Sequence, residues 1–216
     1  MVTGASRGIG AAIAQRLVVD GYHVVAPTRQ EMDLESNTSI DAYLSKIKDH
    51  IDILVNDAGI NRISFLSDIK DQDMDDTLQI NLIAPLRIIR EVSPPMQKKG
   101  FGRIVNISSV WSVVSRAGRI SYSMSKAALN GMTRSLAVEL SPYNILVNAV
   151  APGYVLTDLT RQNNSEAELE TIRKTIPIQR LAEPQEIANI VAFLCSERNT
   201  YLTGQTLVVD GGFTCQ

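Results

Sequence analysis

The alternation of short, continuously apolar runs with longer amphipathic segments most constrains the fold of this chain. Runs without every-second-residue alternation are typical of strands that are buried on both faces of a parallel sheet. Such strands are predicted at residues 23–26, 51–55, 103–107, 145–150 and 206–209. Helices are predicted between them, at residues 9–19, 39–49, 73–98, 121–140 and 184–195. This β-α order predicts one Rossmann-like α/β fold, a doubly wound parallel sheet with helices on both faces.

Length and composition indicate a single domain over residues 1–216, since no repeat or linker divides the chain. A hydrophobic fraction of 44% and a charged fraction of 20% exclude disordered and fibrous classes. The net charge of −2 gives no excess of positive charge with which to bind nucleic acid or an anionic membrane. Two cysteines and two isolated histidines predict neither a disulfide framework nor a metal site. With no signal sequence and no membrane-length apolar run, we expect a cytoplasmic protein.

A glycine-rich turn, residues 3–10, leads directly into the first predicted helix. Gly4, Gly8 and Gly10 allow positive φ and close approach of the backbone, and the helix N-terminus offers free N–H groups to a pyrophosphate. The spacing alone also fits a purely structural turn. Only Met1 and Val2 precede the turn, so the first strand is predicted to be truncated; either it is a stub or the natural start lies elsewhere.

Tyr122 and Lys126 lie four residues apart in a predicted helix, which places both side chains on one face. A nearby ammonium favours the phenolate and is expected to lower the pKa of Tyr122 into a range useful for acid/base work. Such a pair also arises by chance, and its context adds weight. Ser109 follows a buried strand at the edge where such sheets bind ligands. Asn81 interrupts a long helix, either for another role or as an ordinary, backbone-satisfied helix residue.

Together these features resemble the short-chain dehydrogenase/reductase family over nearly the whole chain, with the pattern closest to 3-oxoacyl-(acyl carrier protein) reductases. The resemblance rests on residues 3–10, 56–59, Asn81, Ser109, Tyr122 with Lys126, 152–153 and 203–212, in that order. It implies a catalytic set in which Tyr122 protonates the carbonyl oxygen and Lys126 lowers the pKa of Tyr122 and holds ribose hydroxyls. Ser109 would bind the substrate oxygen and Asn81 a relay water.

The cofactor implied by the resemblance is NADP(H), preferred over NAD(H). No acidic residue directly follows the predicted strand at residues 23–26, where an NAD enzyme would place one. Arg29 stands there and Arg7 lies in the glycine turn, and guanidinium groups suit a 2′-phosphate. The nearby acidic residue Glu31 could weaken the preference for NADP(H) over NAD(H). The chain departs from the family pattern at two places. Asp57 stands where the family more often has Asn, and the helix that usually precedes the position of Asp33 is missing. The expected cofactor contacts are Gly4, Ser6, Arg7, Gly8, Ile9, Gly10, Thr28, Arg29, Asp33, Leu34, Asn56, Ala58, Gly59, Tyr122, Lys126, Pro152, Gly153 and Thr157.

The substrate is expected to be a small-molecule ketone, with a 3-oxoacyl thioester as one candidate. Residues 158–183, polar and irregular, are predicted to form a substrate lid, with an ordinary loop as the alternative.

Trp111 is interpreted either as a wall of the substrate pocket or as an aromatic residue that packs in the protein interior. An acyl carrier protein is a possible partner, and a basic patch that could bind it is formed by Lys98, Lys99 and Arg103. The resemblance also implies a homotetramer. Alternatives are a dehydrogenase of a sugar, polyol or steroid alcohol, or a non-catalytic NADP-binding sensor.

Overall fold

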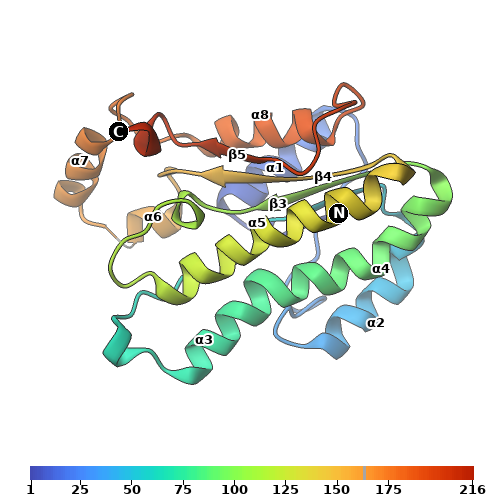
Figure 1. The fold of residues 1–216 in the computed structure, drawn as a ribbon, viewed down its shortest axis with the longest axis horizontal. Helices are drawn as coiled ribbons and strands as arrows, with labels where there is room; N and C mark the ends of the chain where they lie inside the picture. The colour runs from blue at the N-terminus through green and yellow to red at the C-terminus, as the bar shows by residue number, and fades with distance from the viewer. Residues whose placement is uncertain (163) are drawn as a thin grey trace.

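The computed structural model describes residues 1–162 and 164–216 and contains one parallel five-stranded sheet (Figure 1). The strands are β1 (Val2–Thr3), β2 (Ile53–Asn56), β3 (Gly102–Ile107), β4 (Ile145–Pro152) and β5 (Thr206–Val209), and they pair in that order. Helices α1 (Gly8–Val19) and α8 (Pro184–Cys195) cover one face, and α2 (Asn37–Ile47), α4 (Ala84–Lys99) and α5 (Ile120–Leu140) cover the other (Figure 1). The predicted α/β architecture is therefore confirmed.

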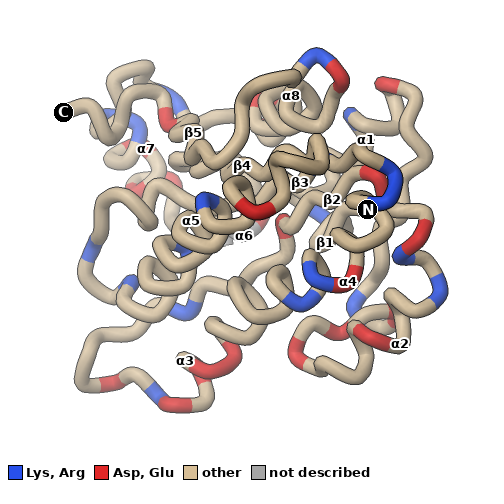
Figure 2. The backbone as a smooth tube through the Cα atoms, turned by 45° about the vertical axis from the view of Figure 1, so that its right-hand side comes forward, with Lys and Arg blue, Asp and Glu red and all other residues tan. Residues whose placement is uncertain are grey.

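Successive side chains of each strand enter two separate cores, one on each face of the sheet. Ile104 packs with α2, α4 and α5, whereas the next residue, Val105, packs with α1 and α8. Every residue of β3 and β4 is buried. This double burial explains why the sequence shows continuous apolar runs in these strands. Acidic and basic residues are interspersed along the backbone (Figure 2).

The predicted strand at residues 23–26 was wrong. These residues form no strand, and one backbone bond, from Val2 N to Val25 O at 2.9 Å, joins them to β1. The physical reason is that β1 has only two residues and offers little backbone to pair with. Residues 27–36 form turns and contain no helix. This agrees with the helix predicted to be missing before Asp33.

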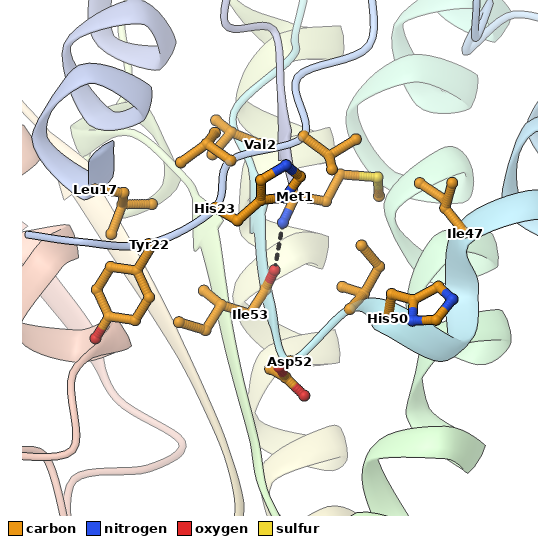
Figure 3. A pocket seen from close by; sticks show the side chains of 12 residues that line it. Met1, Val2, Leu17, Tyr22, His23, Ile47, His50, Asp52 and Ile53 are labelled. Atoms are coloured by element: carbon orange, nitrogen blue, oxygen red, sulfur yellow. Dashed lines mark hydrogen bonds between the residues drawn. The ribbon is translucent and has the colours of Figure 1, made fainter.

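A cavity of about 460 Å³ lies beside the short β1 strand (Figure 3). The Met1 ammonium lies in it and donates a hydrogen bond to Ile53 O at 2.6 Å, and burial lowers its pKa to about 6. His23 and His50 line the cavity. No group of three or more His, Cys, Asp or Glu side chains in the described part of the chain could hold a metal ion.

The predicted helix over residues 73–98 is divided by a π-helical turn. Helix α3 (Asp71–Leu78) passes through this turn, Gln79–Ile83, into α4. A π turn carries one additional residue and is frequently found at functional sites. Here it contains the buried Asn81.

The predicted lid, residues 158–183, contains helices α6 (Asp158–Gln162) and α7 (Glu166–Thr175) at the end of the sheet that also holds the C-terminus (Figure 1). Ser165 and Glu168 form a capping box at the start of α7. The segment has a small apolar cluster of its own, formed by Leu169, Ile172, Ile176 and Leu181. Residue 163 lies outside the described residues. None of the described helices is long and apolar enough to cross a membrane.

Candidate active site

A cleft of about 810 Å³ opens beyond the carboxyl ends of the strands, where parallel α/β sheets bind ligands. It runs from the glycine turn to the start of α5. The predicted site residues that line it are Gly4, Ser6, Arg7, Gly8, Ile9, Thr28, Arg29, Asp33, Leu34, Ala58, Gly59, Ser109, Tyr122, Lys126, Pro152, Gly153 and Thr157. Three predicted residues, Gly10, Asn56 and Asn81, do not line this cleft and support it from behind.

The glycine turn has the geometry of a phosphate cradle. Gly4 has φ +72°, and a Cβ there would lie 2.7 Å from the Ala58 backbone. A Cβ at Gly10 would lie 2.5 Å from the Gly4 carbonyl oxygen and would also clash with the Asp57 carboxylate. Only glycine allows this close approach, and it leaves the N-terminus of α1 facing the cleft. The residues present therefore fit a dinucleotide pyrophosphate.

Asn56 is not among the residues that line the cleft, so its role at the cofactor stays a prediction. Its Nδ2 donates to Asn106 Oδ1 at 2.9 Å, and Asn106 Nδ2 donates to Thr133 Oγ1 at 3.0 Å. This chain of bonds joins β2 to β3 and β3 to α5. Asn56 therefore supports the sheet beneath the site.

Asn81 holds the loop that follows β2. Its Oδ1 accepts from Ile60 N at 2.9 Å, and its Nδ2 donates to Ile60 O at 2.9 Å and to Ser125 Oγ at 3.0 Å. The π turn brings this amide inward, so its role goes beyond helix building. Because both ends of the amide are engaged by protein groups, the Asn81 side chain positions the loop beside Gly59. A relay water at Asn81 stays a prediction.

Tyr122 and Lys126 lie on the first turns of α5, with Lys126 Nζ 5.8 Å from the centroid of the Tyr122 ring. Nζ donates a 2.6 Å hydrogen bond to Ile107 O at the end of β3. Burial lowers the pKa of Lys126 to about 8, against the attraction of Asp57. The two predicted partners and Ser109 thus share one wall of the cleft.

The electrostatics of Tyr122 differ from the expected pattern. Burial raises the pKa of Tyr122, and a hydrogen bond with Ser109 and the charge of Arg119 oppose that rise. The spacing correctly placed Tyr122 and Lys126 on one helix face. Arg119 is a further cation that favours the phenolate, and an effect of Lys126 on the pKa of Tyr122 stays a prediction.

Asp57 occupies a confined position between the glycine turn and Lys126. Burial raises its pKa from 3.8 to about 7, and Lys126 and a hydrogen bond from the Gly10 N–H oppose the rise. The predicted departure at this position therefore introduces a carboxyl group that titrates near neutral pH.

The adenosine end of the cleft carries both predicted arginines, Arg7 and Arg29. Arg29 is exposed and forms ion pairs with Glu35 at 2.9 Å and with Asp33 at 3.6 Å. Glu31 accepts hydrogen bonds from Thr28 N and Oγ1, both at 2.8 Å. Asp33 and Glu35, but not Glu31, therefore occupy the Arg29 guanidinium in this structure.

The predicted basic patch for a carrier protein was wrong in its location. Lys98, Lys99 and Arg103 lie at the amino end of β3, at the opposite edge of the sheet from Ser109. Arg103 is 3% exposed and donates to the carbonyl oxygens of Gly102, Asn144 and Asn199. Lys99 pairs with Asp52.

Sequence reasoning missed an aromatic cluster beside the site. Trp111, Tyr154 and Phe213 meet edge to face, with ring centroids 5.5–6.0 Å apart. Trp111, predicted as either a pocket wall or a packing aromatic, packs against the other two rings, and a role as a pocket wall stays a prediction. The available signal was that each ring follows a predicted strand at its carboxyl end.

Comparisons with known proteins agree with this geometry. The pattern of the family described as "Enoyl-(Acyl carrier protein) reductase" matches residues 26–214, and that described as "short chain dehydrogenase" matches residues 1–40. The chain is 38% identical to the 3-oxoacyl-[acyl-carrier-protein] reductase of Vibrio cholerae over 233 residues, covering 98% of this chain and 95% of the relative.

Solved structures are similar over the same length. A protein from Beutenbergia cavernae, assigned as an NAD(P)-dependent gluconate 5-dehydrogenase and solved with NADP, superposes with a TM-score of 0.94 at 32% identity, covering 100% of this chain and 96% of that chain. A 4-hydroxyisoleucine dehydrogenase with NADH superposes with a TM-score of 0.93 at 29% identity, covering 100% and 98%.

Proposed function

The chain belongs to the short-chain dehydrogenase/reductase family, an NAD(P)-dependent oxidoreductase family, and we propose that it reduces a ketone to a secondary alcohol with NADPH and with Tyr122 as the proton donor. The observation that carries this proposal is the shared wall formed by Ser109, Tyr122 and Lys126, in the same cleft as the glycine turn. A non-catalytic sensor would not require this wall.

The dinucleotide, when bound, supplies the hydride. Ser109 and Tyr122 hydrogen-bond the substrate oxygen, and the Tyr122 hydroxyl donates its proton to that oxygen as negative charge develops. The raised pKa of Tyr122 keeps the phenol protonated at neutral pH, the state that a donor in the reductive direction requires. Lys126, fixed through Ile107 O, is available to the ribose hydroxyls.

NADPH is proposed over NADH because Arg7 and Arg29 line the adenosine end of the cleft. An exposed guanidinium can exchange a carboxylate partner for a 2′-phosphate at little cost. The ion pairs of Arg29 with Asp33 and Glu35 reduce this preference but keep the guanidinium at the cleft. The NADP-bound Beutenbergia protein supports the choice, whereas the NADH-bound dehydrogenase favours the other cofactor.

The second candidate is a dehydrogenase that oxidises a sugar alcohol or hydroxy acid, a possibility favoured by the gluconate 5-dehydrogenase assignment of that neighbour. The 3-oxoacyl reductase relatives support thioester reduction, with an acyl carrier protein as partner. We also propose that the protein is a homotetramer, which light scattering tests. Residues 158–183 are proposed to close over the substrate, and protection of this segment from protease by substrate tests that role.

Steady-state assays of β-ketoacyl thioesters, keto acids, sugars and cyclic ketones with both cofactors test the proposal. Reduction of at least one ketone with a higher kcat/KM for NADPH is expected. Tyr122→Phe should lose nearly all turnover and keep nucleotide binding, because the ring remains and only the proton donor is removed. Activity of this variant within about tenfold of the wild type would refute the role of Tyr122.

A further inference from the structure

Three aromatic side chains, Trp111, Tyr154 and Phe213, form a wall at the carboxyl edge of the sheet, the edge that also carries Ser109. Trp111 follows β3, Tyr154 follows β4 and Phe213 follows β5, so three separate loops each contribute one ring. Trp111 lies 6.0 Å from each of the other two rings, and Tyr154 and Phe213 lie 5.5 Å apart. Mutual edge-to-face packing makes this wall rigid and apolar.

Arg119 brings a guanidinium to this wall. Its Cζ lies 5.8 Å from the centroid of the Trp111 ring, and its side chain is half-buried. The charges that act on Arg119 are the phenols of Tyr122 and Tyr154 and the neighbouring cation of Arg116. No carboxylate in the described part of the chain pairs with it, whereas Arg29, Arg62 and Arg180 all form ion pairs.

Arg119 is therefore a half-buried cation without a carboxylate partner among the described residues, and its charge acts on Tyr122. Burial lowers the pKa of Arg119, which means that its environment penalises the cation. A half-buried cation without a counterion is costly unless an anion arrives to pair with it. The aromatic wall also excludes part of the water that would otherwise screen such a pair.

The backbone holds Arg119 in place. Ser123 N donates to Arg119 O at 2.7 Å, and the preceding Gly118 accepts from Ser64 N at 3.1 Å. Arg119 is the N-cap residue of α5, Tyr122 lies three residues later in the first turn, and the charge of Arg119 acts on the Tyr122 phenol. A molecule that contacts both therefore carries its two polar groups only a few bonds apart.

We propose that Arg119 is a specificity-determining residue that binds a carboxylate of the substrate, which makes the substrate class a short keto acid. The inference rests on the proposed function for the identity of the reacting group, the ketone at Ser109 and Tyr122. The apolar wall of Trp111, Tyr154 and Phe213 packs against the carbon chain between the ketone and the carboxylate. The carboxylate replaces the missing counterion of Arg119.

A matched pair of substrates tests this assignment: 4-oxopentanoate and its methyl ester, which differ in the charge of one group. Because a hydrogen bond to a charged group is involved, we expect kcat/KM for the acid to exceed that for the ester by about 10- to 100-fold. Arg119→Gln should remove this preference: kcat/KM for the acid should fall by at least about tenfold more than that for the ester, mainly through KM, and a loss shared by both substrates reports the effect of the Arg119 charge on Tyr122. The control Arg116→Gln removes the same charge from an exposed position nearby and should keep the preference.

Equal losses on acid and ester in Arg119→Gln would overturn the proposal, because they indicate a role in folding or in the acidity of Tyr122. A wild-type enzyme that prefers the ester would overturn it as well.

A binding measurement separates this inference from the proposed function. Trp111 is the sole tryptophan, so its fluorescence reports on Arg119. Pentanoate, which has no ketone, should cause a saturable change in the wild type and in Arg116→Gln but not in Arg119→Gln, and pentanamide should cause none. This result without turnover of any ketone would support the carboxylate site and refute the proposed function. Ketone turnover with no pentanoate response would refute the site alone, and failure of both assays would refute both.

Discussion

Replacing Asp57 by Asn should stabilise the nucleotide-free protein at alkaline pH and leave its stability nearly unchanged in acid. The folded state raises the pKa of Asp57 from 3.8 to about 7, chiefly through burial. Between these two values the folded protein holds a proton that the unfolded chain has lost. The contribution of Asp57 to stability is therefore full below about pH 4 and is lost as the pH rises through 7.

The magnitude follows from the same shift. One pKa unit corresponds to about 1.4 kcal/mol, so a rise to about 7 implies a penalty of at most about 4 kcal/mol for the ionised group. Lys126, whose own pKa is lowered by burial, compensates the carboxylate only in part. Asparagine has nearly the same shape, and its Oδ1 can still accept from the Gly10 N–H. We expect Asp57→Asn to gain about 2–4 kcal/mol at pH 8.5 and less than about 1 kcal/mol at pH 4.

Urea denaturation at both pH values measures this difference, provided that the slope of the transition is unchanged. The exposed Asp49→Asn is the matched control, because it removes the same charge without relieving burial. A stability change in Asp57→Asn that is equal at the two pH values, or a loss of stability at pH 8.5, would refute the assignment of a buried, strained carboxylate.

Three further substitutions test the site. Arg29→Ala should lower kcat/KM for NADPH about tenfold and change that for NADH little, because only the former carries a 2′-phosphate; a loss shared by both cofactors would contradict the assignment. Asn81→Ala should cost about 2–4 kcal/mol in urea denaturation, since it leaves a backbone N–H and C=O of the loop after β2 without partners; an unchanged midpoint would contradict this. Gly4→Ala should abolish nucleotide binding by calorimetry, because its Cβ would lie 2.7 Å from Ala58. The control Gly21→Ala, also at positive φ but with nothing within 4 Å, should keep binding.

Features that depend on neighbours along the chain could be predicted from the sequence alone. Continuous apolar runs identified the buried strands, and the predicted limits of the last helix and the last strand are those of α8 and β5. The glycine turn and the four-residue spacing of Tyr122 and Lys126 are likewise local. Each depends only on helix or strand geometry within a few residues.

Tertiary structure decided what depends on segments that are far apart in the sequence. Residues 23–26 have strand composition but no strand, because β1 is too short to pair with them. Asn56 turns out to bond Asn106 in the next strand, and the exposed basic patch expected at Arg103 is a buried side chain. The pKa of Tyr122 also depends on its burial, on the hydrogen bond with Ser109 and on the charge of Arg119, none of which the four-residue spacing to Lys126 reveals. Burial and electrostatic interactions are set by distances through space, which local spacing in a sequence does not contain.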